Sequence, residues 1–181
     1  TQAEQLELHI RKREGGMFSG MLFGNDPLIK EKTIMRVRGP MGTFTLNEEE
    51  TQPIILLTTG TGFAPIQSIL LRLIEQQSQR QVHLYWGGRN EAELYYAEQA
   101  AELTGRLKNG CFTPVLSRAD ETWNGARGYV QQQVLRDHPD LSAHQVYACG
   151  SPAMITDAQE ILTGQGRLKN DAFFSDAFSP A

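Results

Sequence analysis

The sequence predicts an α/β domain whose five-stranded parallel sheet carries helices on both faces, preceded by a smaller antiparallel β module. Short apolar segments alternate with helical patterns along residues 51–181. Residues 1–50 instead alternate apolar and polar side chains with a period of two, which is typical of antiparallel strands with one solvated face. The acidic stretch NEEETQ, residues 47–52, separates the two patterns. Because parallel strands need crossover connections, which are usually helices, the alternation in the second part predicts a parallel sheet.

The elements of the larger domain follow from length and periodicity. The segment PIILLTT, residues 53–59, is short, apolar and bounded by proline and glycine, as a strand buried on both faces should be. The next segment is predicted to be a helix, because one apolar stripe recurs at helical spacing. The stripe consists of Ile66, Ile69, Leu70, Leu73 and Ile74. Further strands are predicted over 82–87, 112–117, 145–150 and 172–178, and further helices over 91–103, 128–136 and 152–162.

The first 50 residues are expected to form part of a barrel. Residues 6–13 and 33–46 have the period-two pattern, and the glycine-rich segment GGMFSGMLFGNDP lies between them. A region of this size is small for a closed barrel with its own core. We therefore expect the first strands of the module to lie outside this chain.

Composition excludes several classes of protein. The net charge of −4 leaves no basic excess for binding nucleic acid. No apolar run is long enough for a membrane span and no signal-peptide pattern is present, so we expect no membrane partner and a cytoplasmic location. Cys111 and Cys149 form no C-x-x-C pair, so neither a disulfide framework nor an all-cysteine iron–sulfur cluster held by this chain alone is expected. The four histidines lack the spacing of a metal site, and none is predicted.

The turn TTGTGFAP, residues 58–65, is suited to binding a pyrophosphate. Its glycines let backbone N–H groups approach a phosphate closely, and its threonine hydroxyls add hydrogen bonds. Pro65 is tolerated at a helix start, where the positive end of the helix dipole favours an anion. The turn is not a G-x-G-x-x-G fingerprint, because Pro65 stands where the third glycine belongs, and no lysine makes it a P-loop. A tight strand-to-helix turn without a ligand is the alternative.

Two further strand ends carry residues that suit a flat ligand. Cys149 and Gly150 end one strand, and a small side chain beside a glycine leaves room for a ring. The helix that begins near Pro152 directs its N-terminus to the same edge. Ser117 and Arg118 end another strand, and the loop that follows carries Arg127, where an arginine would hold a phosphate. The alternatives are a cysteine that is only a buried small hydrophobe and an arginine that is only solvated.

Several motifs together resemble a known family. GTGFAP, YWGGR, YACGSPAM and FFSDAF, in this order and spacing, resemble the ferredoxin–NADP reductase superfamily, and GGMFSGMLF and RVRGPMGTF resemble the end of its FAD-binding β-barrel. The residues of these motifs are most similar to those of the bacterial branch in which the reductase is often fused to a plant-type ferredoxin. That branch includes the reductases of aromatic-ring oxygenases and the CDP-6-deoxy-3,4-glucoseen reductases.

The resemblance implies a flavoprotein reductase: NADH or NADPH passes a hydride to FAD, and single electrons leave for a ferredoxin-type iron–sulfur protein or domain. It places Cys149 against the nicotinamide, Asp176 near it, and Phe178 on the isoalloxazine ring as the catalytic residues. Hydride transfer needs two flat rings held about 3–3.5 Å apart rather than a general base, which agrees with these residue types. The alternative is a non-catalytic nicotinamide-nucleotide-binding module. A phosphate-handling enzyme is disfavoured, because the turn lacks a lysine or a metal-binding acidic residue.

The resemblance also assigns the remaining cofactor contacts. Those to the nicotinamide nucleotide are Thr59, Gly60, Thr61, Gly62, Ala64, Pro65, Gly87, Arg89, Ser117, Arg118, Gly150, Pro152 and Met154. Those to the flavin are Gly16, Phe18 and Ser19. The family's Arg-x-Tyr-Ser flavin motif does not occur in this sequence, so we expect the chain alone to bind flavin weakly or not at all. Ser117-Arg118 resembles a pair that binds the 2′-phosphate of NADPH, whereas W-x-G-x-x-G-x-V, Trp123–Val130, resembles NADH-using reductases; both nucleotides stay open, with a lean towards NADH.

Overall fold

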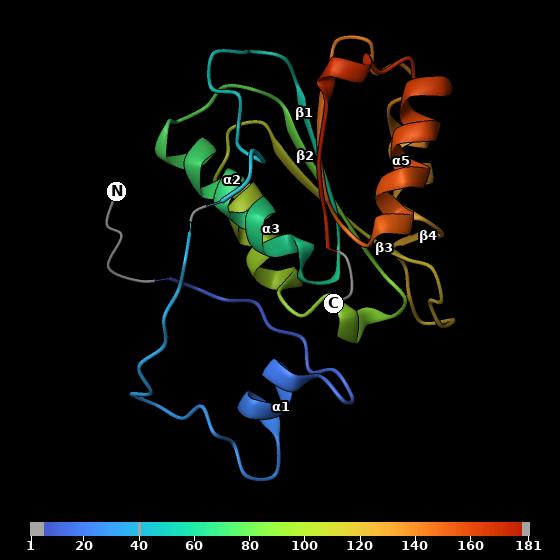
Figure 1. Ribbon diagram of the computed structural model, residues 1–181. Coiled ribbons are helices and arrows are strands. Elements are labelled where there is room, and N and C mark those ends of the chain that lie inside the picture. The colour runs from blue at the N-terminus through green and yellow to red at the C-terminus, as the bar shows by residue number, and fades with distance from the viewer. Residues whose placement is uncertain (1–5, 40, 179–181) are drawn as a thin grey trace. The chain divides into compact units, whose positions relative to one another are not determined.

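The computed structural model describes residues 6–39 and 41–178, which form two compact units (Figure 1). The smaller unit ends at Thr43 and the larger begins at Phe44, ahead of residue 51, where the sequence pattern placed the boundary. Residues 1–5, 40 and 179–181, which include parts of the expected barrel module and the end of the α/β domain, lie outside the described residues.

The larger unit is built on a parallel sheet of six strands in the order β4-β3-β2-β1-β5-β6. The strands are β1 (Ile54–Thr59), β2 (Val82–Gly88), β3 (Gly110–Leu116), β4 (Ala126–Arg127), β5 (Gln145–Gly150) and β6 (Phe173–Ala177). The five strands predicted from the sequence are all present. The sixth, β4, is a two-residue edge strand paired with the end of β3, so the prediction of five strands was one too few.

Helices cover both faces of the sheet, as predicted. The α-helices of this unit are α2 (Phe63–Glu75), α3 (Ala97–Gly105), α4 (Val130–Asp137) and α5 (Pro152–Gly164). Short 3₁₀ turns, η1 (Gly60–Gly62), η2 (Glu91–Glu93) and η3 (Asn170–Ala172), join some of them to the strands. Residues of α2 and α3 share one core cluster, and those of α4 and α5 share the other.

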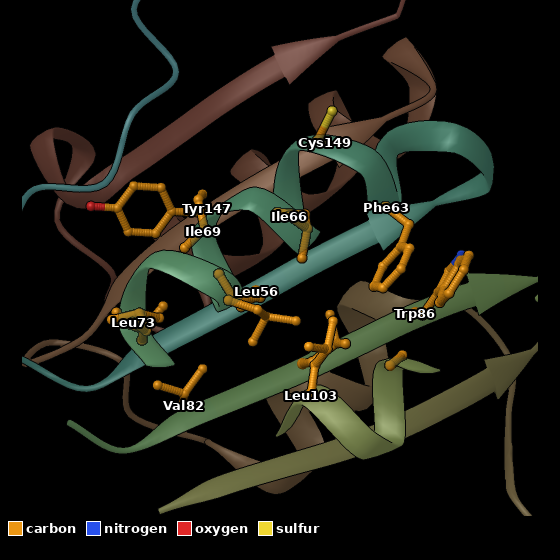
Figure 2. Close-up of a cluster of buried hydrophobic side chains, with 14 of the residues drawn as sticks. Leu56, Phe63, Ile66, Ile69, Leu73, Val82, Trp86, Leu103, Tyr147 and Cys149 are labelled. Carbon is orange, nitrogen blue, oxygen red and sulfur yellow. The ribbon is translucent and has the colours of Figure 1, made fainter. Parts of the chain in front are cut away.

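Strand β1 lies at the centre of both clusters. Side chains alternate between the two faces of a strand, so Ile54 and Leu56 enter the cluster under α2 and α3, whereas Ile55 and Leu57 enter the other. A strand buried on both faces needs a continuous apolar run, which explains the sequence IILL. Figure 2 shows the first cluster, in which the rings of Phe63 and Trp86 are stacked with their centroids 4.2 Å apart.

The strand order places a switch point between β1 and β5. The chain runs outwards from β1 to β2 and β3, then crosses back to β5 on the other side of β1. The helices that follow β1 and β5 pack on opposite faces of the sheet, so the chain switches sides between the carboxyl ends of these two strands. Ligands of open α/β sheets bind at this position.

The smaller unit differs from the prediction. Its described residues contain one helix, α1 (Met17–Phe23), and no strand, so the antiparallel strands expected over 6–13 and 33–46 are not formed there. A strand needs a neighbour for its N–H and C=O groups, and neither segment has one among the described residues of this unit. The glycine-rich segment closes on itself instead, with Gly20 N–H donating to the Gly16 carbonyl. At the other end of 33–46, Phe44 and Leu46 belong to the larger unit and pack on its core.

The helices of the described residues are short or amphipathic, and none combines the length and apolar character needed to cross a bilayer.

Candidate functional site

The loops that follow β1 and β5 touch each other at the carboxyl edge of the sheet. The backbone N–H of Ser151 donates to Thr59 Oγ1 at 3.2 Å. A Cβ on Gly62 would lie 2.3 Å from the Cys149 carbonyl oxygen, so only glycine permits this approach. We call the two loops, residues 59–65 and 149–154, the strand-end site.

Glycine backbone conformations shape this site. Gly60 has φ +55° and Gly150 has φ +151°, both in the region that side chains avoid. A Cβ on Gly150 would lie 2.3 Å from Thr59 Oγ1, and one on Gly87 would lie 3.2 Å from Thr59 Cγ2. The site is therefore lined by main chain, which is what lets amide groups approach a pyrophosphate closely. The residues present fit a dinucleotide.

Two helices begin at the strand-end site. Helix α2 follows the 3₁₀ turn that contains Thr61, and Ala64 and Pro65 stand in its first turn. Helix α5 begins at Pro152, with the Ser151 hydroxyl accepting from the Met154 N–H at 3.3 Å as its N-cap. The first N–H groups of a helix lack intrahelical partners and carry partial positive charge. Two such ends at one edge favour a bound anion.

The three predicted catalytic residues lie beside Gly150. Cys149 is fully buried, and burial, with a smaller effect of the Asp176 carboxylate, raises the pKa of its thiol to about 12. Cys149 and Asp176 are paired in the register of β5 and β6. The Phe178 N–H donates to the Gly150 carbonyl at 2.9 Å, and the Phe178 side chain is 41% exposed. The site thus offers a neutral thiol, a carboxylate and an open aromatic ring.

The ends of β2 and β3 bring the other predicted residues together. The Ser117 N–H donates to the Gly88 carbonyl at 2.9 Å, and the Arg118 N–H donates to the Arg89 carbonyl at 2.8 Å. The Arg89 guanidinium is bound by the carboxylate of Glu93, a residue that the sequence analysis did not single out. Their spacing of four residues was the signal available for finding it.

Arg127 holds the loop after β3 in place. Its guanidinium donates to the carbonyls of Ala119, Asp120 and Trp123, at 3.1, 2.7 and 2.6 Å. The indole N–H of Trp123 in turn donates to the Ala126 carbonyl at 3.0 Å. The Arg127 guanidinium therefore stabilises the conformation of this loop.

The predicted flavin residues lie in the smaller unit. The Ser19 hydroxyl accepts from the Arg13 N–H at 3.0 Å and lies close to the Arg13 carbonyl at 3.2 Å. Gly16 stands at the N-cap position of α1 and lies close to Ser19, because a Cβ on Gly16 would come within 2.7 Å of Ser19 Oγ. Phe18 is 45% exposed. These contacts are internal to the unit, and the flavin role of the three residues stays a prediction.

A cavity of about 270 Å³ opens at the opposite, amino-terminal edge of the sheet. His83, His138, His144 and Cys111 contribute to its lining. It lies at the starts of the strands, away from the strand ends where α/β sheets bind nucleotides. We therefore place no nucleotide there.

The fold and the strand-end site are those of a class of α/β domains that bind dinucleotides at the switch point of the sheet. Comparison of the sequence with protein families identifies the member of that class. Residues 56–160 match the family described as Oxidoreductase NAD-binding domain, and the chain belongs to this family, within the ferredoxin–NADP reductase superfamily.

Relatives and solved structures agree with this assignment. The chain is 45% identical over 179 residues to the CDP-6-deoxy-L-threo-D-glycero-4-hexulose-3-dehydrase reductase of Yersinia pestis, covering 97% of this chain and 52% of that protein. It is 32% identical over 180 residues to a probable flavin reductase of Aliivibrio fischeri, and this match covers 99% of this chain and 76% of that protein. The crystal structure of the Amycolatopsis cytochrome P450 reductase GcoB matches with a TM-score of 0.78 and 27% identity, covering 96% and 52%. The chain thus spans about half the length of the dehydrase reductase and of the P450 reductase.

Proposed function

We propose that this chain supplies the nicotinamide-nucleotide site of an NAD(P)H-dependent flavoprotein reductase. In this reaction a hydride passes from NADH or NADPH to FAD, and electrons then leave one at a time for a ferredoxin-type iron–sulfur protein or domain. The observation that carries the proposal is the direct contact between the loops after β1 and β5 at the switch point of the sheet. Relatives named as reductases support it.

The residues of the β1 loop would hold the pyrophosphate. Gly60, Thr61 and Gly62 present main chain and a hydroxyl at the start of α2, where an anion is favoured. Ala64 and Pro65 in the following turn are small or rigid and leave this end of the helix open. On the other loop, Pro152 and Met154 begin α5 next to Gly150.

The residues around Cys149 would position the redox rings. When bound, the nicotinamide supplies the hydride and the flavin accepts it. The thiol stays protonated at neutral pH because burial raises its pKa to about 12, so it contributes a small, uncharged contact and no base. Phe178 keeps part of its ring exposed for stacking, and Asp176 lies beside Cys149. Catalysis by such residues rests on positioning rather than on acid–base chemistry.

The flavin side of the proposal rests on the smaller unit. Gly16, Phe18 and Ser19 would contact the flavin from the start of α1. We expect the chain alone to hold FAD weakly. A cytoplasmic location is part of the same proposal, since both Cys111 and Cys149 are free thiols, which a reducing compartment preserves.

A titration with NADH and NADPH, with and without added FAD, tests the function. We expect the absorbance of added FAD to be bleached on addition of the reduced nucleotide. Bleaching should be slower in Cys149→Ala. In Phe178→Ala the preference between NADH and NADPH should change. Binding of the nucleotide without any flavin reduction, even at high FAD concentration, would support the non-catalytic module instead. That alternative is not favoured at present, because the relatives are named as reductases.

A further inference from the structure

We propose that Glu93, just beyond the end of β2, makes the nucleotide site selective for NADH over NADPH by holding Arg89 away from the 2′-phosphate. This inference rests on the proposed function. NADPH differs from NADH only by a phosphate on the 2′-hydroxyl of the adenosine ribose. In dinucleotide-binding sheets that hydroxyl lies near the end of the second strand, where an acidic residue suits NAD and an arginine suits NADP.

The structure brings two arginines to this place. Strand β2 ends at Gly88, so Arg89 is the first residue beyond it. Arg118 follows β3, the neighbour of β2, and its backbone bonds to the Arg89 carbonyl. By sequence alone, two arginines at adjacent strand ends suit a phosphate dianion.

Arg89 is already engaged by Glu93. The Arg89 Nε–H donates to Glu93 Oε1 at 2.7 Å, and the Arg89 backbone N–H donates to Oε2 of the same carboxylate at 2.8 Å. The Arg89 Nη2 also contacts this carboxylate. The Glu93 side chain is only 23% exposed, so it is better fixed than a typical surface partner. A 2′-phosphate that approached Arg89 would meet the Glu93 carboxylate as a like charge.

The surrounding charges do not compensate. Arg127 is committed to three loop carbonyls, and Arg118 is the one guanidinium of the three without a hydrogen-bond or ion-pair partner among residues 6–39 and 41–178. The segments 89–93 and 117–127 contain three arginines and four carboxylates. The four are Glu91, Glu93, Asp120 and Glu121. With one more carboxylate than guanidinium, the net charge of these two segments disfavours a dianion, and Arg118 is the one guanidinium of the three that is left to bind it.

The test uses two probes that differ only by the 2′-phosphate, ADP-ribose and 2′-phospho-ADP-ribose, titrated calorimetrically into the protein. We expect the unmodified protein to bind ADP-ribose more tightly. Glu93→Gln removes the negative charge and releases Arg89, so the affinity ratio should shift towards the phosphorylated probe by roughly tenfold, the size expected for one charge-assisted contact. The gain should shrink at high salt, because it is electrostatic.

Glu91→Gln is the matched control. It removes the same charge from the same 3₁₀ turn, while the Arg89–Glu93 contacts stay in place. We expect it to leave the ratio within about twofold, as one screened surface charge would. Adding Arg89→Ala to Glu93→Gln should cancel the gain. Glu93→Ala serves as a second release variant, and melting curves show that each variant is folded.

Three outcomes would overturn the inference. They are a preference of the unmodified protein for the phosphorylated probe, equal affinities for both probes, and the same shift in Glu91→Gln as in Glu93→Gln. In each of these the nucleotide site itself survives. If the folded protein bound neither probe, the proposed function would fail together with the inference, so the two failures are distinguishable.

Discussion

Gly150 shows at the scale of one residue how closely the two loops depend on each other. Its φ of +151° is unfavourable for a side chain, and a Cβ would lie 2.3 Å from Thr59 Oγ1. We predict that Gly150→Ala destabilises the protein by about 1–3 kcal/mol and weakens binding of ADP-ribose at least tenfold, because the loops must separate. Urea unfolding and calorimetric titration measure the two effects.

Gly164→Ala is the control for that substitution. Gly164 is the last residue of α5, and a Cβ added there would meet no atom within 4 Å, so alanine should stabilise the helix by less than the ~0.5–1 kcal/mol typical of a helix interior and leave binding unchanged. Unaltered stability and binding in Gly150→Ala would show that the contact between the loops is unimportant.

The glycines of the site could be predicted from the sequence because the turn requires them. The partners of the charged residues could not be predicted in this way. Gly60, Gly62 and Gly150 stand in a strand–turn–helix pattern whose backbone needs are general. The engagement of Arg127 depends on where three loop carbonyls point, which no local pattern encodes. Arg89 and Glu93 have the spacing of a helical ion pair, but a 3₁₀ turn rather than a regular helix joins them, so the spacing alone indicates this pair only weakly.

At the scale of elements, the strands and helices of the larger unit followed from periodicity because both faces of the sheet are buried. Strand β4 was missed because its two residues are too few to show any period, and its pairing with β3 is set by the loop that Arg127 and Trp123 hold. The strands expected over 6–13 and 33–46 show the opposite error. An alternating pattern of apolar and polar residues favours a strand, but a strand forms only where a neighbouring strand completes its hydrogen bonds.

The loop between β3 and β4 supplies an element-scale prediction. Arg127→Ala removes the donor to three carbonyls, so amide hydrogen exchange over 117–128 should accelerate at least tenfold while the central strands stay protected. Arg106→Ala is the control, because Arg106 lies after α3 and its described hydrogen bonds come from its backbone. Exchange that is equally slow in both variants would contradict a structural role for Arg127.

At the scale of the whole sheet, the two edges have different chemistry. The carboxyl edge presents helix starts and glycines, whereas the amino edge carries a cluster of neutral imidazoles, defined here as His83, His138 and His144. His83 lies 3.1 Å from His138 between ring nitrogens and 2.9 Å from the Tyr85 hydroxyl, which donates to Asp137. Burial, with a smaller effect of His138, lowers the pKa of His83 to about 4. Burial also lowers the pKa values of His138 and His144.

This cluster predicts the acid sensitivity of the fold. A histidine whose pKa is lower in the folded chain than its unfolded value of about 6.5 binds fewer protons when folded, so stability falls as pH drops from about 6.5 towards 4. Each such histidine contributes at most about 1.4 kcal/mol per pH unit, and less here because the cluster is partly solvated. Carboxylates with lowered pKa, such as Asp120 and Asp140, reduce stability mainly below about pH 5, so the histidines dominate between about pH 6.5 and pH 5.

Melting temperatures measured between about pH 8 and pH 4.5 test this prediction. The curve should be flat near pH 8 and descend below about pH 6.5. His83→Gln should lower the melting temperature at neutral pH, since the bonds to Tyr85 and Thr113 change, and should make the acid descent shallower. His9→Gln, in the smaller unit outside the cluster, should leave the descent as steep as before. A descent of the same steepness in His83→Gln would assign the acid sensitivity to other groups, because a side chain that cannot titrate cannot contribute to it.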